Sequence, residues 1–339
     1  MFKPMLVAAL VLLPFSQPVF AQADAAKKGE AKKEEPAKKE PAKKEPPARP
    51  DPTAKDFAYG TESERQKFDF WQAKSDKPTP VVLLIHGGGW VNGDKTSYGT
   101  SSIKPYLDAG ISVAAVNYRF IPQAMEQKVE PPVKACLHDA ARALQTIRSK
   151  AKEWNLNPER VGATGGSAGA CTSLWLAMHD DLADLKSEDP VAKQSTRLTC
   201  AAVSGAQTSL DPKELREWIP NSIYGGHAFG FAAKGRTRPE EFDLLIANRD
   251  KVLPWIKEYS PIELTSKDDP PVFLDYGNQK TPPVVGQKEA DPTHSAMYGV
   301  KLVEKLTPLG VEAIVSYPGH KDEKYGSIPA FLIKKLNAP

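Results

Sequence analysis

The chain has 339 residues and a formal net charge of only +3, from 45 Lys and Arg against 42 Asp and Glu. Ten of the basic and eight of the acidic residues lie in residues 24–56, and apart from Lys3 the rest of the chain is evenly balanced. This balance excludes the strongly basic composition typical of nucleic-acid-binding domains, so no nucleic acid partner is expected.

Residues 1–23 have the pattern of a signal peptide. Lys3 precedes an apolar stretch at residues 5–20, and residues 21–23 supply the small side chains that a signal peptidase prefers. The stretch is short and contains two prolines, which disfavours a permanent membrane helix. The pattern predicts a secreted or periplasmic protein with no stable membrane insertion after cleavage.

A low-complexity segment follows at residues 24–55. It repeats units similar to Ala-Lys-Lys-Glu-Pro and contains almost no apolar side chain larger than alanine. Such a segment cannot bury enough surface to offset the entropy of ordering it. We therefore expect a disordered linker, with a basic tail that binds nucleic acid or an anionic polymer as the alternative, and one folded domain over residues 56–339.

Residues 81–85 form a continuous apolar run that ends at His86 and predicts a buried parallel strand. Gly87, Gly88 and Gly89 follow it, and their unshielded backbone N–H groups can point into a cavity. An oxyanion hole requires donors of this kind. The alternative, a phosphate-binding loop, lacks the residues that should follow the glycines.

A second motif surrounds Ser167. It reads Gly-Gly-Ser-Ala-Gly and joins a predicted strand at residues 160–164 to a predicted helix at residues 168–178. Small residues around the serine permit the strained turn of a nucleophile elbow, in which Oγ is exposed. From this motif alone, a plain loop is the alternative.

Together the two motifs resemble those of the α/β-hydrolase superfamily, specifically the esterases with a His-Gly-Gly-Gly loop upstream of the serine. The loop is followed by Trp90, Gly93, Asp94 and Lys95. These residues make the chain similar to the feruloyl and acetyl-xylan esterase-like carbohydrate esterases. The resemblance covers residues 57–338. It implies that Ser167 is the nucleophile, that Gly88, Gly89 and Ala168 donate to the oxyanion, and that no cofactor is used.

The remaining predicted elements alternate along the chain. Strands are predicted at residues 111–118, 200–204, 271–276 and 311–317, and helices at residues 133–154, 298–306 and 328–336. This alternation predicts an α/β fold with a mainly parallel central sheet and helices on both faces. Sites in such folds lie at the carboxyl ends of the strands.

One insertion, at about residues 211–260, interrupts the alternation and contains several aromatic residues and paired glycines. The resemblance implies that it lies over the active site as a lid or substrate wall, where aromatic rings could stack on a sugar. The alternative is that these rings pack the core of the insertion itself.

The acid and the histidine of the triad are expected after the serine, in that order. We assign the histidine to His320, which follows a Tyr-Pro-Gly turn as in the relatives, and treat His294 as a loop histidine. We assign the acid to Asp291 rather than to Asp275 or Glu289, because relatives have an aspartate ahead of a serine-led helix there.

The three cysteines carry two interpretations: a disulfide between Cys136 and Cys171, or three buried free thiols that include Cys200. Metal ligation is not expected, because no His-x-x-x-His or Cys-x-x-Cys pair occurs.

The sequence thus predicts an exported serine esterase that acts on acyl groups of plant-type polysaccharide or on small acyl esters. A short-chain lipase-like esterase, an exopeptidase and a non-catalytic binding protein on a degenerate hydrolase fold remain the alternatives.

Overall fold

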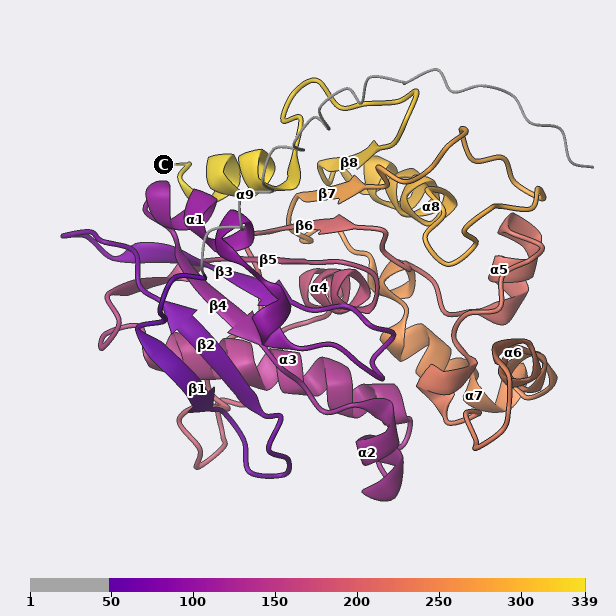
Figure 1. Ribbon diagram of the computed structural model, residues 1–339, viewed down its shortest axis with the longest axis horizontal. Helices are drawn as coiled ribbons and strands as arrows, with labels where there is room; N and C mark the ends of the chain where they lie inside the picture. The colour runs from indigo at the N-terminus through magenta and orange to yellow at the C-terminus, as the bar shows by residue number, and fades with distance from the viewer. Residues whose placement is uncertain (1–48, 339) are drawn as a thin grey trace, which may run out of the picture. The chain divides into compact units, whose positions relative to one another are not determined.

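A computed structural model describes residues 49–338 of the chain, and they form an eight-stranded sheet covered by helices (Figure 1). The strand order is β1-β2-β4-β3-β5-β6-β7-β8. The strands are β1 (Ala54–Ala58), β2 (Lys67–Trp71), β3 (Thr79–Ile85), β4 (Ser112–Val116), β5 (Leu156–Gly165), β6 (Cys200–Ser204), β7 (Val272–Asp275) and β8 (Ala313–Ser316). From β4 through β8 neighbouring strands are parallel, and only the β1/β2 and β2/β4 pairs are antiparallel. The predicted α/β architecture is confirmed.

Nine α-helices lie within residues 49–338. They are α1 (Thr100–Asp108), α2 (Ile121–Glu126), α3 (Pro132–Ser149), α4 (Ala168–Met178), α5 (Pro212–Trp218), α6 (Arg238–Ala247), α7 (Arg249–Tyr259), α8 (Met297–Leu306) and α9 (Ile328–Leu336). Figure 1 shows α1 and α9 together on one face of the sheet, and α3 and α4 on the other.

The two faces of the sheet produce two apolar cores. In β3 the side chains alternate, so that Leu83 and Ile85 pack with α3 and α4 while Val82 and Leu84 pack with α1 and α9. This period of two lets a strand without polar residues be buried on both sides. All five side chains of residues 81–85 are buried, as the apolar run predicted.

The N-terminal boundary differs from the prediction at residues 55/56. Strand β1 already begins at Ala54, and the Arg49 guanidinium lies 2.9 Å from the fully buried carboxylate of Asp69. Arg49 also lies over the ring of Trp71, at 4.5 Å. The composition of the segment does not predict this contact. A single arginine that pairs with a carboxylate and packs on an aromatic ring adds almost nothing to the hydrophobicity of the segment. The proposed signal peptide and most of the proposed linker lie outside the described residues.

The insertion at residues 211–260 folds into α5, the short η2 helix (Gly226–Phe229), α6 and α7. Its aromatic rings mainly pack inward, which agrees with the interpretation that they form the core of the insertion itself. The buried rings are those of Trp218, Tyr224, Phe229 and Phe242, and the rings partly buried against the core are those of Phe231 and Trp255. Tyr224 lies 6.0 Å from Trp90, next to the glycine loop. The insertion therefore supports that loop from the side.

The cysteines are all free and buried, so the hypothesised disulfide between Cys136 and Cys171 is not formed. Burial raises the pKa of both thiols well above the usual range. Cys136 and Cys171 behave as small apolar groups in the core between the sheet and helices α3 and α4, and Cys200 does so in the core on the opposite face.

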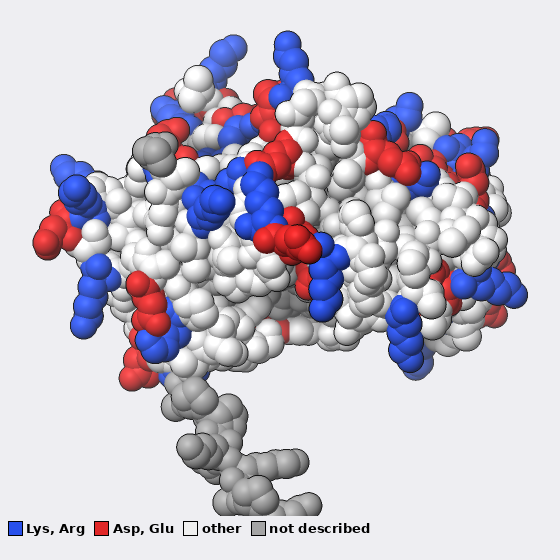
Figure 2. Space-filling model, turned by 90° about the horizontal axis from the view of Figure 1, so that it is seen from above, with Lys and Arg blue, Asp and Glu red and all other residues white. Residues whose placement is uncertain are grey.

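Charged side chains of both signs are interspersed on the face shown in Figure 2, without a continuous basic area. Over residues 49–338 we find no helix with the length and apolar character needed to cross a membrane.

Candidate active site

Ser167 occupies the sharp turn between β5 and α4. Its backbone dihedrals are φ 54° and ψ −122°, a strained conformation for a residue with a side chain, and α4 begins at the next residue. The turn depends on the glycines beside it, because a Cβ on Gly169 would lie 1.9 Å from the carbonyl oxygen of Ile85. Only glycine lets α4 approach the end of β3 this closely.

His294, and not His320, contacts the serine. Nε2 of His294 lies 2.9 Å from Oγ of Ser167, and Nδ1 lies 2.8 Å from Oδ2 of Asp291. Since a carboxylate only accepts hydrogen bonds, Nδ1 carries the proton and Nε2 is left to accept from the hydroxyl. The three side chains form one continuous hydrogen-bonded chain, with Asp291 in the position that the sequence analysis gave to the acid.

The expectation that His320 would reach Ser167 is wrong for this structure. After β8 the chain makes a tight turn through Gly319, in which the backbones of Tyr317 and His320 exchange hydrogen bonds of 2.8 and 3.1 Å. The imidazole of His320 stacks on the ring of Tyr317, with 5.2 Å between the centroids. Within residues 49–338, His320 makes no hydrogen bond to Ser167 in this conformation.

A signal for His294 was present in the sequence. An aspartate three residues before a histidine lets both side chains meet within one turn, and here Oδ1 of Asp291 also accepts from the backbone N–H groups of Thr293 and His294. Gln207 fixes this turn from the neighbouring strand end by donating to the carbonyl of Thr293 at 2.6 Å. The side chains of His294 and Asp291 remain 35% and 58% exposed, so the site is open to solvent.

The glycine loop after β3 lies beside Ser167. Within residues 49–338, no acceptor is paired with the backbone N–H of Gly88, Gly89 or Ala168. Gly88 has φ +102°, and a Cβ there would lie 2.1 Å from the side chain of Asn92. The loop conformation thus requires glycine at Gly88, and the loop begins beside the serine, where a Cβ on Gly87 would lie 3.4 Å from Cβ of Ser167.

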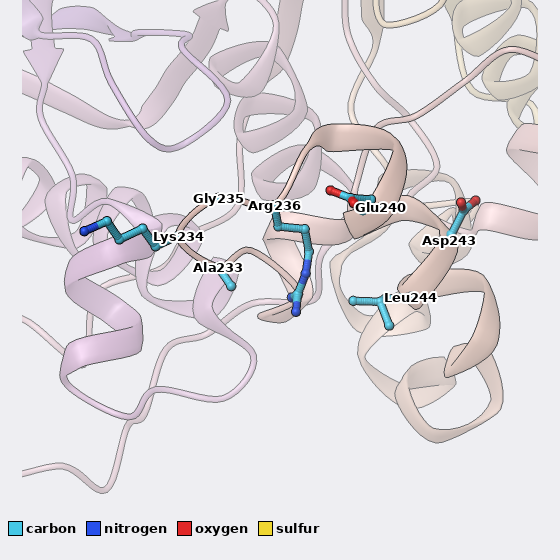
Figure 3. Close-up of a pocket in the computed structure, with 7 residues that line it drawn as sticks. All are labelled: Ala233, Lys234, Gly235, Arg236, Glu240, Asp243 and Leu244. Atoms are coloured by element: carbon cyan, nitrogen blue, oxygen red, sulfur yellow. The ribbon is translucent and has the colours of Figure 1, made fainter. Parts of the chain in front are cut away.

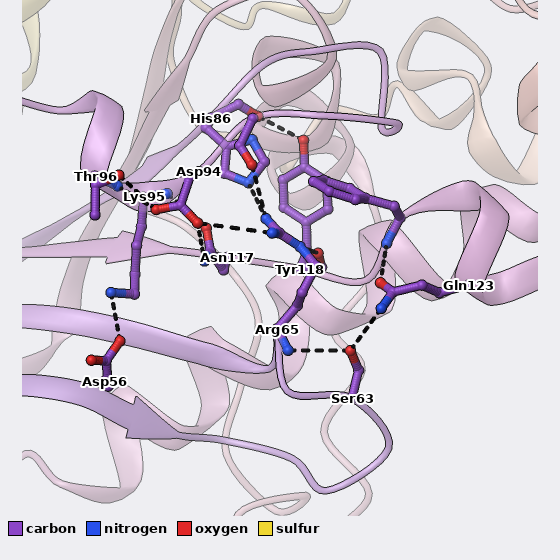
Figure 4. A network of polar contacts seen from close by, with 12 residues as sticks. Asp56, Ser63, Arg65, His86, Asp94, Lys95, Thr96, Asn117, Tyr118 and Gln123 are labelled. Carbon is purple, nitrogen blue, oxygen red and sulfur yellow. Dashed lines mark hydrogen bonds and ion pairs between the residues drawn. The ribbon is translucent and has the colours of Figure 1, made fainter.

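His86 holds the start of this loop (Figure 4). Its Nδ1 lies 2.8 Å from the carbonyl of Gly87 and its Nε2 lies 3.3 Å from Nη2 of Arg65. The pKa of His86 is lowered to about 4, mainly because the imidazole is buried and to a smaller extent because of the nearby charge of Arg65. The imidazole is therefore neutral at pH 7, with its proton on Nδ1, and it braces the loop rather than exchanging protons.

Arg65 connects His86 to the rest of the network in Figure 4. It donates to the carbonyls of Tyr118 and Gly93, at 2.9 and 3.0 Å, and its guanidinium lies 3.7 Å from the ring centroid of Phe120. The Tyr118 hydroxyl in turn donates to the carbonyl of His86 at 2.8 Å. One guanidinium thus ties both ends of the glycine loop to the segment that follows β4.

Two cavities need to be distinguished. One, of about 430 Å³, has Ser167 and His294 in its wall. Another, of about 580 Å³, lies between the loop at residues 233–236 and α6 (Figure 3), and neither of these residues lines it. The first is the candidate substrate site. Among the described residues no group of three or more His, Cys, Asp or Glu side chains is arranged to hold a metal ion.

Comparison with known families matches residues 69–294 to the BD-FAE family, which is more than half of the chain. The chain belongs to the BD-FAE family. The part that matches BD-FAE includes the glycine loop, Ser167, Asp291 and His294, and it ends before His320.

Two curated proteins of Mycobacterium tuberculosis are among the relatives of this BD-FAE chain. The probable carboxylic ester hydrolase LipM is 28% identical over 126 residues, covering 36% of this chain and 28% of LipM. The carboxylesterase NlhH is 30% identical over 108 residues, covering 32% of each chain. The match spans about a third or less of the length of these relatives.

Solved structures resemble this BD-FAE chain over most of its length. A truncated carbohydrate esterase from gut microbiota has a TM-score of 0.60 at 18% identity, over 86% of this chain and 100% of that one. An acetyl ester-xyloside bifunctional hydrolase from Caldicellulosiruptor lactoaceticus has a TM-score of 0.53 at 21% identity, over 74% and 76%. At these identities the likeness shows the fold, and the predicted α/β-hydrolase fold is confirmed.

Proposed function

We propose that this protein is an exported serine esterase in which Ser167, His294 and Asp291 form the triad. The observation that carries the proposal is the unbroken hydrogen-bonded chain from Ser167 Oγ through both nitrogens of His294 to Asp291. The curated relatives named as carboxylic ester hydrolases support the reaction class.

In the proposed reaction, Oγ of Ser167 attacks the ester carbonyl while Nε2 of His294 takes the hydroxyl proton. The backbone N–H groups of Gly88, Gly89 and Ala168 stabilise the negative charge that develops on the carbonyl oxygen. The C–O bond to the alcohol then breaks, and His294 gives its proton to the leaving alcohol. Water, deprotonated by His294, attacks the acyl-enzyme and releases the acid, with Asp291 holding the imidazole in the required tautomer throughout.

We propose acyl groups on polysaccharide, or small acyl esters, as the substrates. The carbohydrate esterase and the acetyl ester-xyloside hydrolase among the structural neighbours support this class, and the proposed signal peptide at residues 1–23 would deliver the enzyme to such polymers. Acetyl, butyryl and feruloyl esters assayed beside acetylated xylan would identify the acyl group.

A fluorophosphonate probe is expected to modify Ser167 rapidly, because only an activated serine attacks such an electrophile quickly. Intact-mass analysis should show one adduct on the folded protein and on Ser75→Ala, which alters an exposed serine, and none on Ser167→Ala. Absence of the adduct from the unaltered protein would favour the non-catalytic binding protein instead.

Replacing Arg65 with alanine is expected to lower kcat for a small ester by about tenfold or more, while folding is retained. Removing one oxyanion donor costs about 10²–10³ in rate, and a loop that has lost its anchor should lose part of that stabilisation. The measurement is kcat and KM for phenyl acetate, with Lys67→Ala as a control at a partly exposed position at the start of β2. A change in KM alone, with kcat unaltered, would mean that Arg65 does not position the loop.

A further inference from the structure

The cavity beside Ser167 has an unusual wall. Four glycines contribute no side chain to it, and besides the serine and His294 its remaining lining residues are Ser204, Asp275, Tyr276 and Asn278. The Tyr276 hydroxyl is already bonded to the carbonyl of Ala206, at 2.9 Å. The free functional groups in the wall are therefore a hydroxyl, a carboxylate and an amide, with no aliphatic surface to bind a long acyl chain.

Ser204 and Asp275 are directly paired in the sheet. Each is the last residue of its strand, β6 and β7, and the two strands are parallel and in register at this pair. Paired residues of neighbouring parallel strands point to the same face, at a strand spacing of about 4.8 Å. Gly166, immediately before the serine, pairs with Ser204 on the other side. The carboxylate of Asp275 is therefore two strands away from the elbow, in the same row.

Asp275 is a carboxylate without a protein donor. Within residues 49–338 no hydrogen bond or ion pair reaches its side chain, and the same holds for the side chains of Ser204 and Asn278. Partial burial raises the pKa of Asp275, and the charge of Lys321 only partly opposes this effect. A carboxylate in this position can accept hydrogen bonds from donors in the cavity, either water or hydroxyl groups of a ligand that displaces the water.

We infer that Asp275, with Ser204 and Asn278, forms a subsite that binds adjacent hydroxyl groups of the alcohol part of the substrate and disfavours alcohols that carry a carboxylate. This inference rests on the proposed esterase function. A carboxylate accepts two parallel hydrogen bonds, which fits a vicinal diol such as that of a pyranoside, and Ser204 and Asn278 can each donate or accept. A carboxylate on the substrate would instead face the charge of Asp275 at short range.

The test compares three substrates that share one acetyl group: a mono-acetylated methyl xyloside, phenyl acetate, and an acetylated methyl glucuronoside. In Asp275→Ala, the ratio of kcat/KM for the xyloside to that for phenyl acetate should fall at least tenfold, because bonds to a charged acceptor are lost. In Asp275→Asn, the ratio of kcat/KM for the glucuronoside to that for the xyloside should rise at least severalfold. Asp76→Ala and Asp76→Asn are the matched controls at an exposed aspartate.

A second readout does not require turnover of a sugar ester. Unesterified methyl xyloside should inhibit phenyl acetate hydrolysis competitively, and its inhibition constant should rise in Asp275→Ala and in Ser204→Ala, with thermal melting used to verify folding. An unchanged substrate ratio and inhibition constant would overturn the inference. The inference would also be overturned if an acetate ester that carries an ammonium group had a higher kcat/KM than the xyloside and this preference were lost in Asp275→Ala, because the subsite would then bind cations.

The two proposals fail in different ways. If the unaltered protein neither hydrolyses phenyl acetate nor forms the serine adduct, the esterase proposal fails. If it does both but Asp275→Ala lowers kcat/KM equally for all three substrates, only the subsite inference is overturned, since Asp275 would then act on the triad itself.

Discussion

Replacing His294 with alanine is expected to lower kcat/KM for phenyl acetate by about four orders of magnitude or more. The serine hydroxyl would have no base, and removal of a triad member leaves only the rate enhancement from the oxyanion donors and from binding. Ser167 should also lose its rapid reaction with a fluorophosphonate, because its Oγ hydrogen bond to His294 at 2.9 Å is the only activating contact seen within residues 49–338.

His320→Ala is the matched control, since it removes the same side chain from the next loop at the same edge of the sheet. It should cost less than tenfold, because His320 stacks on Tyr317 and makes no contact with Ser167. Both variants should melt near the unaltered protein. Loss of activity in His320→Ala together with near-normal activity in His294→Ala would reverse the assignment and require the loop after β8 to rearrange when substrate binds.

Replacing Asp291 with asparagine is expected to lower kcat by about 10²–10⁴-fold with little change in KM. An amide at 2.8 Å from Nδ1 can donate as well as accept, so it favours the imidazole tautomer with the proton on Nε2, which cannot take the serine proton. Because the Asp291 side chain is 58% exposed, water can partly substitute for it, and we expect the effect near the lower end of this range.

Asp76→Asn serves as the control for Asp291→Asn, since it makes the same chemical change at an exposed position. The contrary outcome is specific: near-normal kcat in Asp291→Asn with a large loss in Asp275→Asn on phenyl acetate. That result would transfer the role of the acid to the carboxylate at the end of β7 and would remove Asp275 from the proposed subsite.

Much of the fold could be predicted from local sequence. Residues 168–178, 200–204 and 328–336 form α4, β6 and α9 within the predicted bounds. The elbow at Ser167 was recognisable because its geometry depends on short-range steric limits that only small neighbours satisfy, and the glycine loop for the same reason. The antiparallel strands β1 and β2 were missed, since the edge strand β1 and its neighbour β2 contain charged residues and lack the continuous apolar run that marks a central strand.

The choice between the two histidines was decided by tertiary structure alone. His294 and His320 both follow a strand of the same sheet, so strand order brings each to the edge where Ser167 stands. What separates them is the path of two loops: a tight turn keeps His320 on Tyr317, whereas a longer loop, fixed by Gln207, brings Asp291 and His294 across to the serine. The sequence by itself determined which chemical groups are present and which backbone turns are sterically possible. Whether these groups come together depends on contacts between residues far apart in the chain. Ser167 and His294, for example, are separated by 127 positions, and no local pattern encodes their contact.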